Sequence, residues 1–405
     1  MLGSAKSLRC VAMLTMLASA RVCLAGDWDL RGDAAVELRV FPDEPLFTGQ
    51  DDSHLSPSLK LEPEVGYEWN GGNDRIILRP FFRLDKDDDN RTHFDLRELN
   101  WLHLGNKWTL QAGNGKVFWG VTESRHLVDI INQDDQVEDV DGEDKLGQPM
   151  INLTLESEWG AFDFFYLPFF RERTFPDDHA RLRGALRIDE NPNYESGAEE
   201  FHPDWAARWS NTVNDFDVGV AFFYGTSREP RFIPSKREGG DLVLKPFYDI
   251  VDQTSLDLQW TKDAWLLKLE AMTRGGQGDR FFASVSGFEY TIFQVFESAA
   301  DLGLLAEYLY DGRDKRNASS TVFDNDFFSG VRLALNDVED TTVLGGTVTD
   351  LKHGEVSTFL EVSRRIGQRW LVEFESRWFL NTDSDSPAFN FRRDGFFTIR
   401  LSRFF

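Results

Sequence analysis

Nearly every segment after residue 30 alternates between apolar and polar side chains with a period of two residues, and this alternation constrains the fold more than any other feature. Between residues 354 and 366, one face carries Val356, Thr358, Leu360 and Val362, and the other carries Glu355, Ser357, Glu361, Ser363 and Arg365. A period of two is typical of a β-strand with one apolar and one wet face. No segment shows a convincing helical period, so the chain is predicted to be all-β.

The connections between the alternating stretches indicate how the strands are arranged. About eighteen stretches follow one another, the first at 32–42 and the last at 391–405. Every second connection is tight. The intervening connections are mostly long and polar and lack a strand pattern, at 120–147, 171–202, 226–246, 311–325 and 381–390. Adjacent strands of a transmembrane barrel leave the bilayer on opposite sides, which produces this rhythm of short turns and long outer loops. We therefore predict a transmembrane antiparallel up-and-down β-barrel of about 18 strands, with 16 as the alternative.

The first twenty-five residues have the three-part pattern of a secretory signal. Lys6 and Arg9 precede an apolar stretch, and small residues end the segment at Cys23-Leu24-Ala25. This pattern predicts a cleaved signal peptide over 1–25. The remaining 26–405 are predicted to form a single outer-membrane barrel with long extracellular loops.

Cysteine usage and hydropathy support export without a helical anchor. Both cysteines, Cys10 and Cys23, lie inside the predicted signal, so the mature chain has no disulfide or thiol chemistry. No later run approaches the roughly 18 apolar residues that a membrane-spanning helix needs.

The last ten residues form an alternating strand that ends in an aromatic side chain. Phe397, Ile399, Leu401 and Phe405 share one face. This stretch resembles the terminal recognition strand of bacterial outer-membrane proteins. The resemblance implies that Phe405 is an assembly signal read by the barrel-assembly machinery. It also implies the bacterial cell outer membrane as the location, with lipid and lipopolysaccharide around the barrel.

Composition and missing motifs exclude several function classes. The net charge of −25 opposes binding to nucleic acid, whose phosphates would be repelled. The seven histidines show no metal-ligand spacing, and there is no nucleophile elbow or phosphate-binding loop. We therefore expect no enzyme activity, no catalytic residue, no cofactor and no metal. Aromatic residues make up 14% of the chain, which suits the aromatic girdles of a barrel.

Charged side chains on the wet faces are predicted to line the lumen. Arg79, Arg83, Arg208 and Lys268 form the candidate basic face, and Glu270, Glu307, Glu361, Glu373 and Glu375 oppose them in sign. A wide barrel that contains water accommodates such charges most simply, since burial without partners costs several kcal/mol for each charge. A small barrel filled by salt bridges is the alternative.

The third outer loop, 120–147, is the most acidic segment of the chain. Its acids are Glu123, Asp129, Asp134, Asp135, Glu138, Asp139, Asp141, Glu143 and Asp144, whereas Arg125 and Lys145 are its only arginine and lysine. In position it is similar to the third outer loop of general porins, which folds inward and narrows the pore. That resemblance implies a constriction loop that faces Arg79 and Arg83 across the lumen and favours cations. A solvated loop, a divalent-cation site and a partner contact are the alternatives, although the segment lacks the spacing of an EF-hand.

A second resemblance covers about residues 95–170. The stretch Val117-Phe118-Trp119-Gly120, followed by residues 127–134 with Asp129 and Asn132, looks like poorly characterised proteobacterial outer-membrane proteins. It implies a porin-like channel whose substrate is not settled. The acidic insertion after Asn132 departs from some relatives, so a shared substrate does not follow.

Two function classes remain at this point. The first is a porin-like channel for passive or weakly selective diffusion of small polar solutes, with a preference for cations. The second is a non-conducting barrel whose surface loops bind a partner or polysaccharide, with the lumen closed by 120–147 and 171–202. Either class is compatible with a homo-oligomer.

Overall fold

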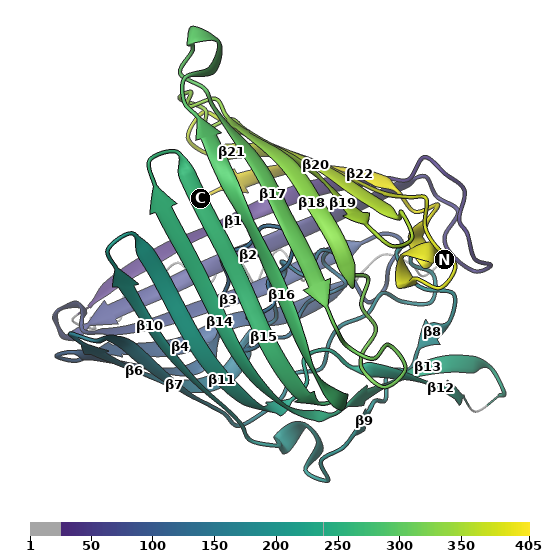
Figure 1. The fold of residues 1–405 in the computed structure, drawn as a ribbon, viewed down its shortest axis with the longest axis horizontal. Coiled ribbons are helices and arrows are strands. Elements are labelled where there is room, and N and C mark those ends of the chain that lie inside the picture. Colours follow the sequence, from purple (N-terminus) through teal and green to yellow (C-terminus); the bar gives the residue numbers. More distant parts are fainter. Residues whose placement is uncertain (1–25, 238) are drawn as a thin grey trace, which may run out of the picture.

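Eighteen antiparallel strands form one closed ring in the computed structural model, which describes residues 26–237 and 239–405. Each strand of the ring pairs with the next one along the chain, and β22 pairs with β1 to close it (Figure 1). The predicted signal peptide over 1–25 lies outside the described residues. The predicted all-β up-and-down barrel is confirmed, with eighteen strands rather than sixteen.

The strands of the ring are β1 (Asp27–Val40), β2 (Leu55–Trp69), β3 (Asp74–Asp85), β4 (His93–Leu104), β5 (Trp108–Gly115), β6 (Gln148–Ser157), β7 (Gly160–Leu167), β10 (Asp204–Val213), β11 (Phe216–Thr226), β14 (Ile250–Lys262), β15 (Trp265–Gly276), β16 (Gly278–Ile292), β17 (Asp301–Asp311), β18 (Asn325–Ala334), β19 (Thr342–Asp350), β20 (Val356–Ile366), β21 (Trp370–Leu380) and β22 (Phe396–Phe404).

The period-two pattern places apolar side chains on the outside of the ring and charged ones inside. On β1, Val36 is exposed on the outer face, whereas Glu37 and Arg39 are buried in the interior. The register with β2 sets Val36 opposite Leu59, another exposed apolar side chain. The outer surface is therefore an apolar belt suited to lipid.

Residues of β4 give conflicting signals about which face points outward. Phe94 and Leu96 suggest one register, and Leu99 and Trp101 suggest the other. The pairing between β3 and β4 shifts at Arg79/Pro80, so that Leu96 and Glu98 both have partners and Arg97 is the extra residue. A β-bulge therefore lets both apolar pairs face outward.

The short turns lie at the end of the barrel where β1 begins and β22 ends. Several of these turns need a left-handed backbone, which asparagine and aspartate adopt more readily than most residues. Asn214 and Asp263 occupy such positions, with φ angles of 55° and 53°. These residues therefore favour tight turns, and each tight turn places a strand beside the next one along the chain.

The outer loops contain regular structure that the sequence pattern did not predict. A small second sheet consists of β8 (Arg187–Ile188), β9 (Asn193–Tyr194), β12 (Arg231–Lys236) and β13 (Leu242–Tyr248). The expectation that 171–202 and 226–246 lack strands was therefore wrong. β8 and β9 have two residues each, which is too short to show an alternating pattern.

Short 3-10 turns make up the helical content of the described residues: η1 (Asn70–Gly72), η2 (Glu199–Phe201), η3 (Val295–Glu297) and η4 (Pro387–Phe391). Within residues 26–237 and 239–405, no helix has the length and apolar character needed to cross a membrane.

The two faces of β20 should respond differently to a new charge. Leu360→Arg places a guanidinium in the apolar belt and should lower the free energy of unfolding by about 2–4 kcal/mol, the cost of arginine near the bilayer midplane. Ser363→Arg, on the inner face of the same strand and opposite Glu373, is the matched control and should cost far less. Urea titration of the barrel in lipid vesicles measures both variants. Equal losses would contradict the assignment of the two faces.

Candidate functional site

The third outer loop, 116–147, leaves β5 and runs inside the ring of strands (Figure 1). Asn132 holds its two ends together. The backbone N–H of Val117 donates to the side-chain oxygen of Asn132 over 2.8 Å, and the Asn132 amide donates to the carbonyls of Gly115 and Leu146 over 2.9 and 2.8 Å. The asparagine of the Asp-x-x-Asn motif is therefore a structural clamp at the root of the loop.

Two glutamates of the barrel wall capture the far end of the loop. Glu270 of β15 accepts hydrogen bonds from the backbone N–H groups of Val121 and Thr122 over 2.7 and 3.0 Å. Glu307 of β17 accepts from the N–H groups of Glu123 and Ser124, each over 2.8 Å. Hydrogen bonds to a charged acceptor are about twice as strong as neutral ones. The loop therefore crosses from β5 to the opposite wall and is fixed there.

Apolar side chains pack the loop against three sectors of the wall. Val128 and Ile131, both 0% exposed, belong to a cluster with Phe165 and Phe223 of β7 and β11. A second cluster joins Leu127 to the inner faces of β15 to β18. A third cluster includes Val140 with the side chains Phe41, Leu182, Phe391 and Phe396. The loop is therefore packed against the wall in these three sectors.

The acidic half of the loop is paired with arginines from four strands of the wall. The pairs are Asp135 with Arg97 at 2.6 Å, Glu138 with Arg83 at 2.6 Å, Asp139 with Arg39 at 3.2 Å and Asp141 with Arg377 at 3.1 Å. These arginines belong to β4, β3, β1 and β21. The loop carboxylates thus bridge to the wall on both sides of the seam between β22 and β1.

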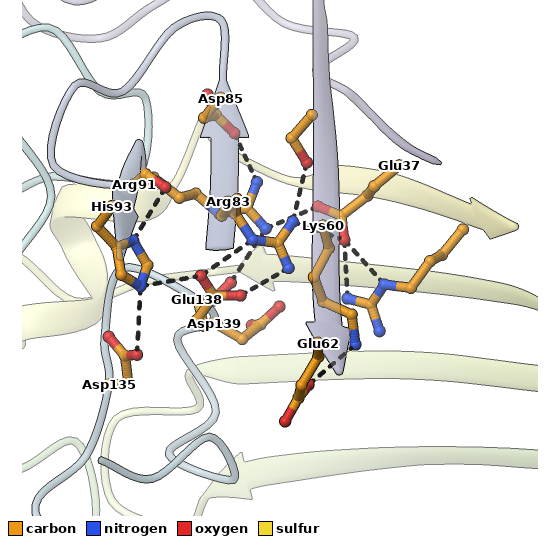
Figure 2. A network of polar contacts seen from close by, with 12 residues as sticks. Glu37, Lys60, Glu62, Arg83, Asp85, Arg91, His93, Asp135, Glu138 and Asp139 are labelled. Atoms are coloured by element: carbon orange, nitrogen blue, oxygen red, sulfur yellow. Dashed lines mark hydrogen bonds and ion pairs between the residues drawn. The ribbon is translucent and has the colours of Figure 1, made fainter. Parts of the chain in front are cut away.

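Glu37 of β1 is the hub of the buried charges at this seam (Figure 2). Its carboxylate lies 2.7 Å from Arg91, 3.4 Å from Arg83 and 2.8 Å from Arg400 of β22. Glu37, Arg83 and Arg91 are each at least 95% buried. Because Arg83 also binds Glu138 of the loop, barrel closure and loop position depend on one network.

The predicted basic residues all project inward, but they do not form one face. Arg83 pairs directly with Glu138, whereas Arg79 pairs with Glu64 and Glu98 of the neighbouring strands. The sequence predicted that the acidic loop would face Arg79 and Arg83 across the lumen. That prediction was wrong, because Arg83 contacts the loop and Arg79 is paired with glutamates of the wall.

The other two members of the predicted basic face lie in different sectors. Arg208 of β10 pairs with Asp257 of β14 at 2.5 Å, and Lys268 of β15 lies 3.6 Å from Glu123. The sequence did not indicate the carboxylates that pair with these charges, one on β14 and one in the third outer loop, although the period-two pattern placed the basic residues on the inner face.

The remaining loop acids have separate surroundings. Asp134 pairs with Lys145 at 2.6 Å and with Arg173 at 2.5 Å, and Glu143 contacts His126 at 3.1 Å. Asp144 lies on the exposed part of the loop.

The side chain of Asp129 is fully buried. Burial raises its pKa to about 6, although Lys145 at 3.3 Å acts in the opposite direction.

The fourth outer loop, 168–203, covers the outer mouth of the barrel. It leaves β7 and reaches the loops beside β1 and β22. The amide of Gln50 donates to the Arg181 carbonyl over 2.6 Å, and the Arg181 guanidinium lies 3.0 Å from Asp394. The backbone N–H of Asp51 donates to the His179 carbonyl over 2.7 Å. A second layer of chain therefore lies over the third outer loop.

Among the residues that the structure describes, two clusters of side chains have the spacing of metal ligands. One comprises His93, Asp135 and Glu138, and the other comprises Asp139, Asp141 and Glu375. Arginines pair with carboxylates in both groups, and their charge opposes a cation. We therefore assign no metal to either group.

Sequence reasoning missed Glu37, Arg39, Arg91, Arg97, Arg377 and Arg181. A usable signal existed for Glu37 and Arg39, because both fall on the polar face of an alternating strand. Nothing local marks Arg91 or Arg181, since they lie in outer loops whose path depends on the whole barrel.

Comparisons with known proteins agree with this architecture. Wzi, an outer-membrane protein involved in group 1 capsule assembly in Escherichia coli and a carbohydrate-binding β-barrel, matches with a TM-score of 0.51 at 9% identity, over 92% of this chain and 84% of Wzi. A mutant of the Rh. blastica porin matches with a TM-score of 0.45 at 10% identity, over 94% of this chain and 100% of the porin. OmpT of Vibrio cholerae matches with a TM-score of 0.46 at 11% identity, over 94% of this chain and 100% of OmpT.

No family model matches the chain, and no curated protein matches it. The likeness to Wzi at this identity shows the fold alone. The closed eighteen-stranded ring with its apolar outer belt is an outer-membrane β-barrel, and the protein belongs to the bacterial outer membrane.

Removing the charge of Glu37 should destabilise the barrel. Glu37→Gln leaves Arg83, Arg91 and Arg400 without a shared carboxylate, and breaking a buried pair costs about 3–5 kcal/mol. Glu62→Gln is the control, because Glu62 makes a half-exposed contact with Lys60 at 3.4 Å and such pairs contribute at most about 1 kcal/mol. The urea midpoint of Glu37→Gln should be clearly lower than that of Glu62→Gln. Similar midpoints would show that the ion pairs of Glu37 do not stabilise the barrel more than a wall pair does.

Alanine at Glu270 should release the far end of the third outer loop. Glu270→Ala removes the acceptor for the N–H groups of Val121, Thr122 and Val128. Hydrogen exchange followed by mass spectrometry should show exchange in 121–128 at least tenfold faster than in the wild type. The strand amides of β15 should keep their protection, which distinguishes loop release from unfolding. Unchanged exchange in 121–128 would show that the apolar clusters alone hold the loop.

Proposed function

We propose that this protein is a surface-binding outer-membrane barrel whose outer loops hold polysaccharide and whose lumen is closed. One observation carries the proposal: the third outer loop is tied to β1, β3, β4, β15, β17 and β21, and therefore spans the lumen. Apolar packing on three sectors supports closure at the same depth. The carbohydrate binding stated for Wzi agrees with this proposal, although the shared feature is the fold.

A porin-like channel for small polar solutes is the second candidate. The inner wall on the periplasmic side favours it, because Arg31 and Arg79 have side chains 56% and 33% exposed. Water therefore reaches far into the barrel from that side. A narrow path beside the third outer loop would then conduct cations weakly, as its acids predict.

The surface-binding proposal includes several expectations from the sequence. Four of them remain predictions: membership of the poorly characterised proteobacterial family, the absence of enzyme activity, recognition of Phe405 by the assembly machinery, and contact with lipopolysaccharide. The C-terminal residue does continue the barrel seam, since its backbone N–H donates to the Gly32 carbonyl over 3.0 Å. A homo-oligomer stays an open expectation.

Planar-bilayer recording tests closure directly. The refolded wild-type barrel should give no steady conductance in potassium chloride. A deletion of residues 134–144 removes four loop-to-wall ion pairs and should open channels that do not prefer cations, because the four wall arginines then lack their carboxylates. Heat-modifiable gel migration must show that both proteins are folded. Steady conductance of the wild type would contradict closure and favour the channel.

Retention of the same refolded barrel on immobilised surface polysaccharide from the source bacterium tests binding. The wild type should be retained and released by free polysaccharide. A folded barrel that is not retained would overturn the surface-binding function.

A further inference from the structure

A cavity of about 460 Å³ opens among the outer loops above the third outer loop. Residues of several loop segments line it: 89–90, 172–179, 188–190, Pro192, Arg237, Pro246 and Tyr248, together with Val137 of the third outer loop. Its volume falls within the range of about 300–1,000 Å³ that small-molecule sites occupy. None of the residues that we assign to lumen closure needs to move for a ligand to enter it from outside the cell.

The walls of the cavity are fixed by hydrogen bonds between loops. The Asn90 amide donates to the Phe175 carbonyl over 3.0 Å, and the Asp89 N–H donates to the Asp177 carboxylate over 2.6 Å. The Thr174 hydroxyl bonds to Asp135 of the third outer loop over 2.6 Å. A site whose walls are held in place loses less entropy when it binds.

The charge of the lining is strongly negative. Six carboxylates line the cavity: Asp89, Glu172, Asp177, Asp178, Asp189 and Glu190. The lining also includes the guanidinium groups of Arg173 and Arg237. Arg173 is already paired with Asp134 at 2.5 Å, so it offers little charge to a ligand.

Asp89 and Glu190 are the carboxylates most available to a ligand. Both are exposed, and neither side chain has an ion pair within the described part of the chain. Asp177, by contrast, is used to hold backbone N–H groups, and Asp178 pairs with Arg187 at 3.0 Å. Free carboxylates accept hydrogen bonds from hydroxyl and ammonium groups and repel other anions.

Apolar surface completes the lining. Phe175, Pro176, Pro192 and Tyr248 border the cavity. The Tyr248 ring is 1% exposed, and its hydroxyl accepts the Arg173 N–H over 3.0 Å. Apolar faces with a few convergent polar groups suit a ring that carries hydroxyls.

We propose that this cavity binds a neutral or amine-bearing saccharide segment and discriminates against acidic saccharides. The proposal rests on the surface-binding function and names its site and ligand class. Hydroxyl or ammonium groups of the ligand would donate to Asp89 and Glu190, with the sugar ring against Phe175 and the neighbouring prolines. A uronate would meet six carboxylates and be repelled.

Binding of three oligosaccharide probes to the refolded full barrel tests the proposal. Dextran oligosaccharides are neutral, chitosan oligosaccharides carry amines and hyaluronan oligosaccharides carry uronates. The wild type should bind dextran or chitosan at least tenfold more tightly than hyaluronan. The double variant Asp89→Arg with Glu190→Arg should lose at least tenfold in affinity for the preferred probe.

A matched control separates the cavity from general surface charge. Asp52→Arg with Asp385→Arg changes the net charge of other outer loops equally, away from the cavity lining, and should leave affinity within twofold of the wild type. Equal losses in both double variants, or tighter binding of hyaluronan, would overturn the proposal.

The two binding experiments distinguish failure of the cavity proposal from failure of the surface-binding function. If the barrel is retained on extracted polysaccharide but binds none of the three probes, or binds them regardless of Asp89 and Glu190, the cavity proposal is wrong and the surface-binding function stands. If the folded barrel is not retained on that polysaccharide, the surface-binding function itself is wrong.

Discussion

Ion pairs and charge-assisted hydrogen bonds between the third outer loop and the barrel wall are the interactions on which the rest of the structure depends. A ring of eighteen strands is wide enough to leave an aqueous channel if nothing fills it. Here a charged loop lies inside the ring, and each of its buried charges then needs a partner. Glu270 and Glu307 accept the loop N–H groups on one wall, and Arg39, Arg83, Arg97 and Arg377 meet the loop carboxylates on the other.

These polar contacts and the apolar clusters have different parts in holding the loop. Burial of Val128 and Ile131 removes apolar surface from water and stabilises the packed state without specifying direction. The ion pairs add geometry, because a misplaced loop would leave guanidiniums and carboxylates unpaired in a dry interior. The ion pairs therefore determine where the loop lies, and the apolar contacts supply much of the favourable free energy of packing it there.

The pairing also changes what the acidic loop can do. Carboxylates bound to arginine do not provide the free negative charge that the sequence predicted would favour cations in a constriction. Available negative charge is found instead at the outer surface, where Asp89 and Glu190 line a cavity. The path of the third outer loop through the lumen and the acidic outer cavity are the two features on which the proposed surface-binding function rests.

Local features of the sequence were enough to predict much of the fold. Alternation along strands such as β1 and β20, together with the rhythm of short turns and long loops, predicted the barrel and its strand count. The small sheet of β8, β9, β12 and β13 escaped prediction, because two of its strands have only two residues. The acidic loop and the inward faces of Arg79, Arg83, Arg208 and Lys268 were found, but not their partners.

The sequence by itself determined a chain whose strands alternate and turn as those of a barrel do, because alternation and turn chemistry act over a few residues. Only the tertiary structure decided which charges meet. Asp139 and Arg39 are 100 residues apart in sequence, and Asp141 and Arg377 are 236 apart. Such pairs form only after the ring has closed and brought both walls within reach of one loop, so no local pattern records them.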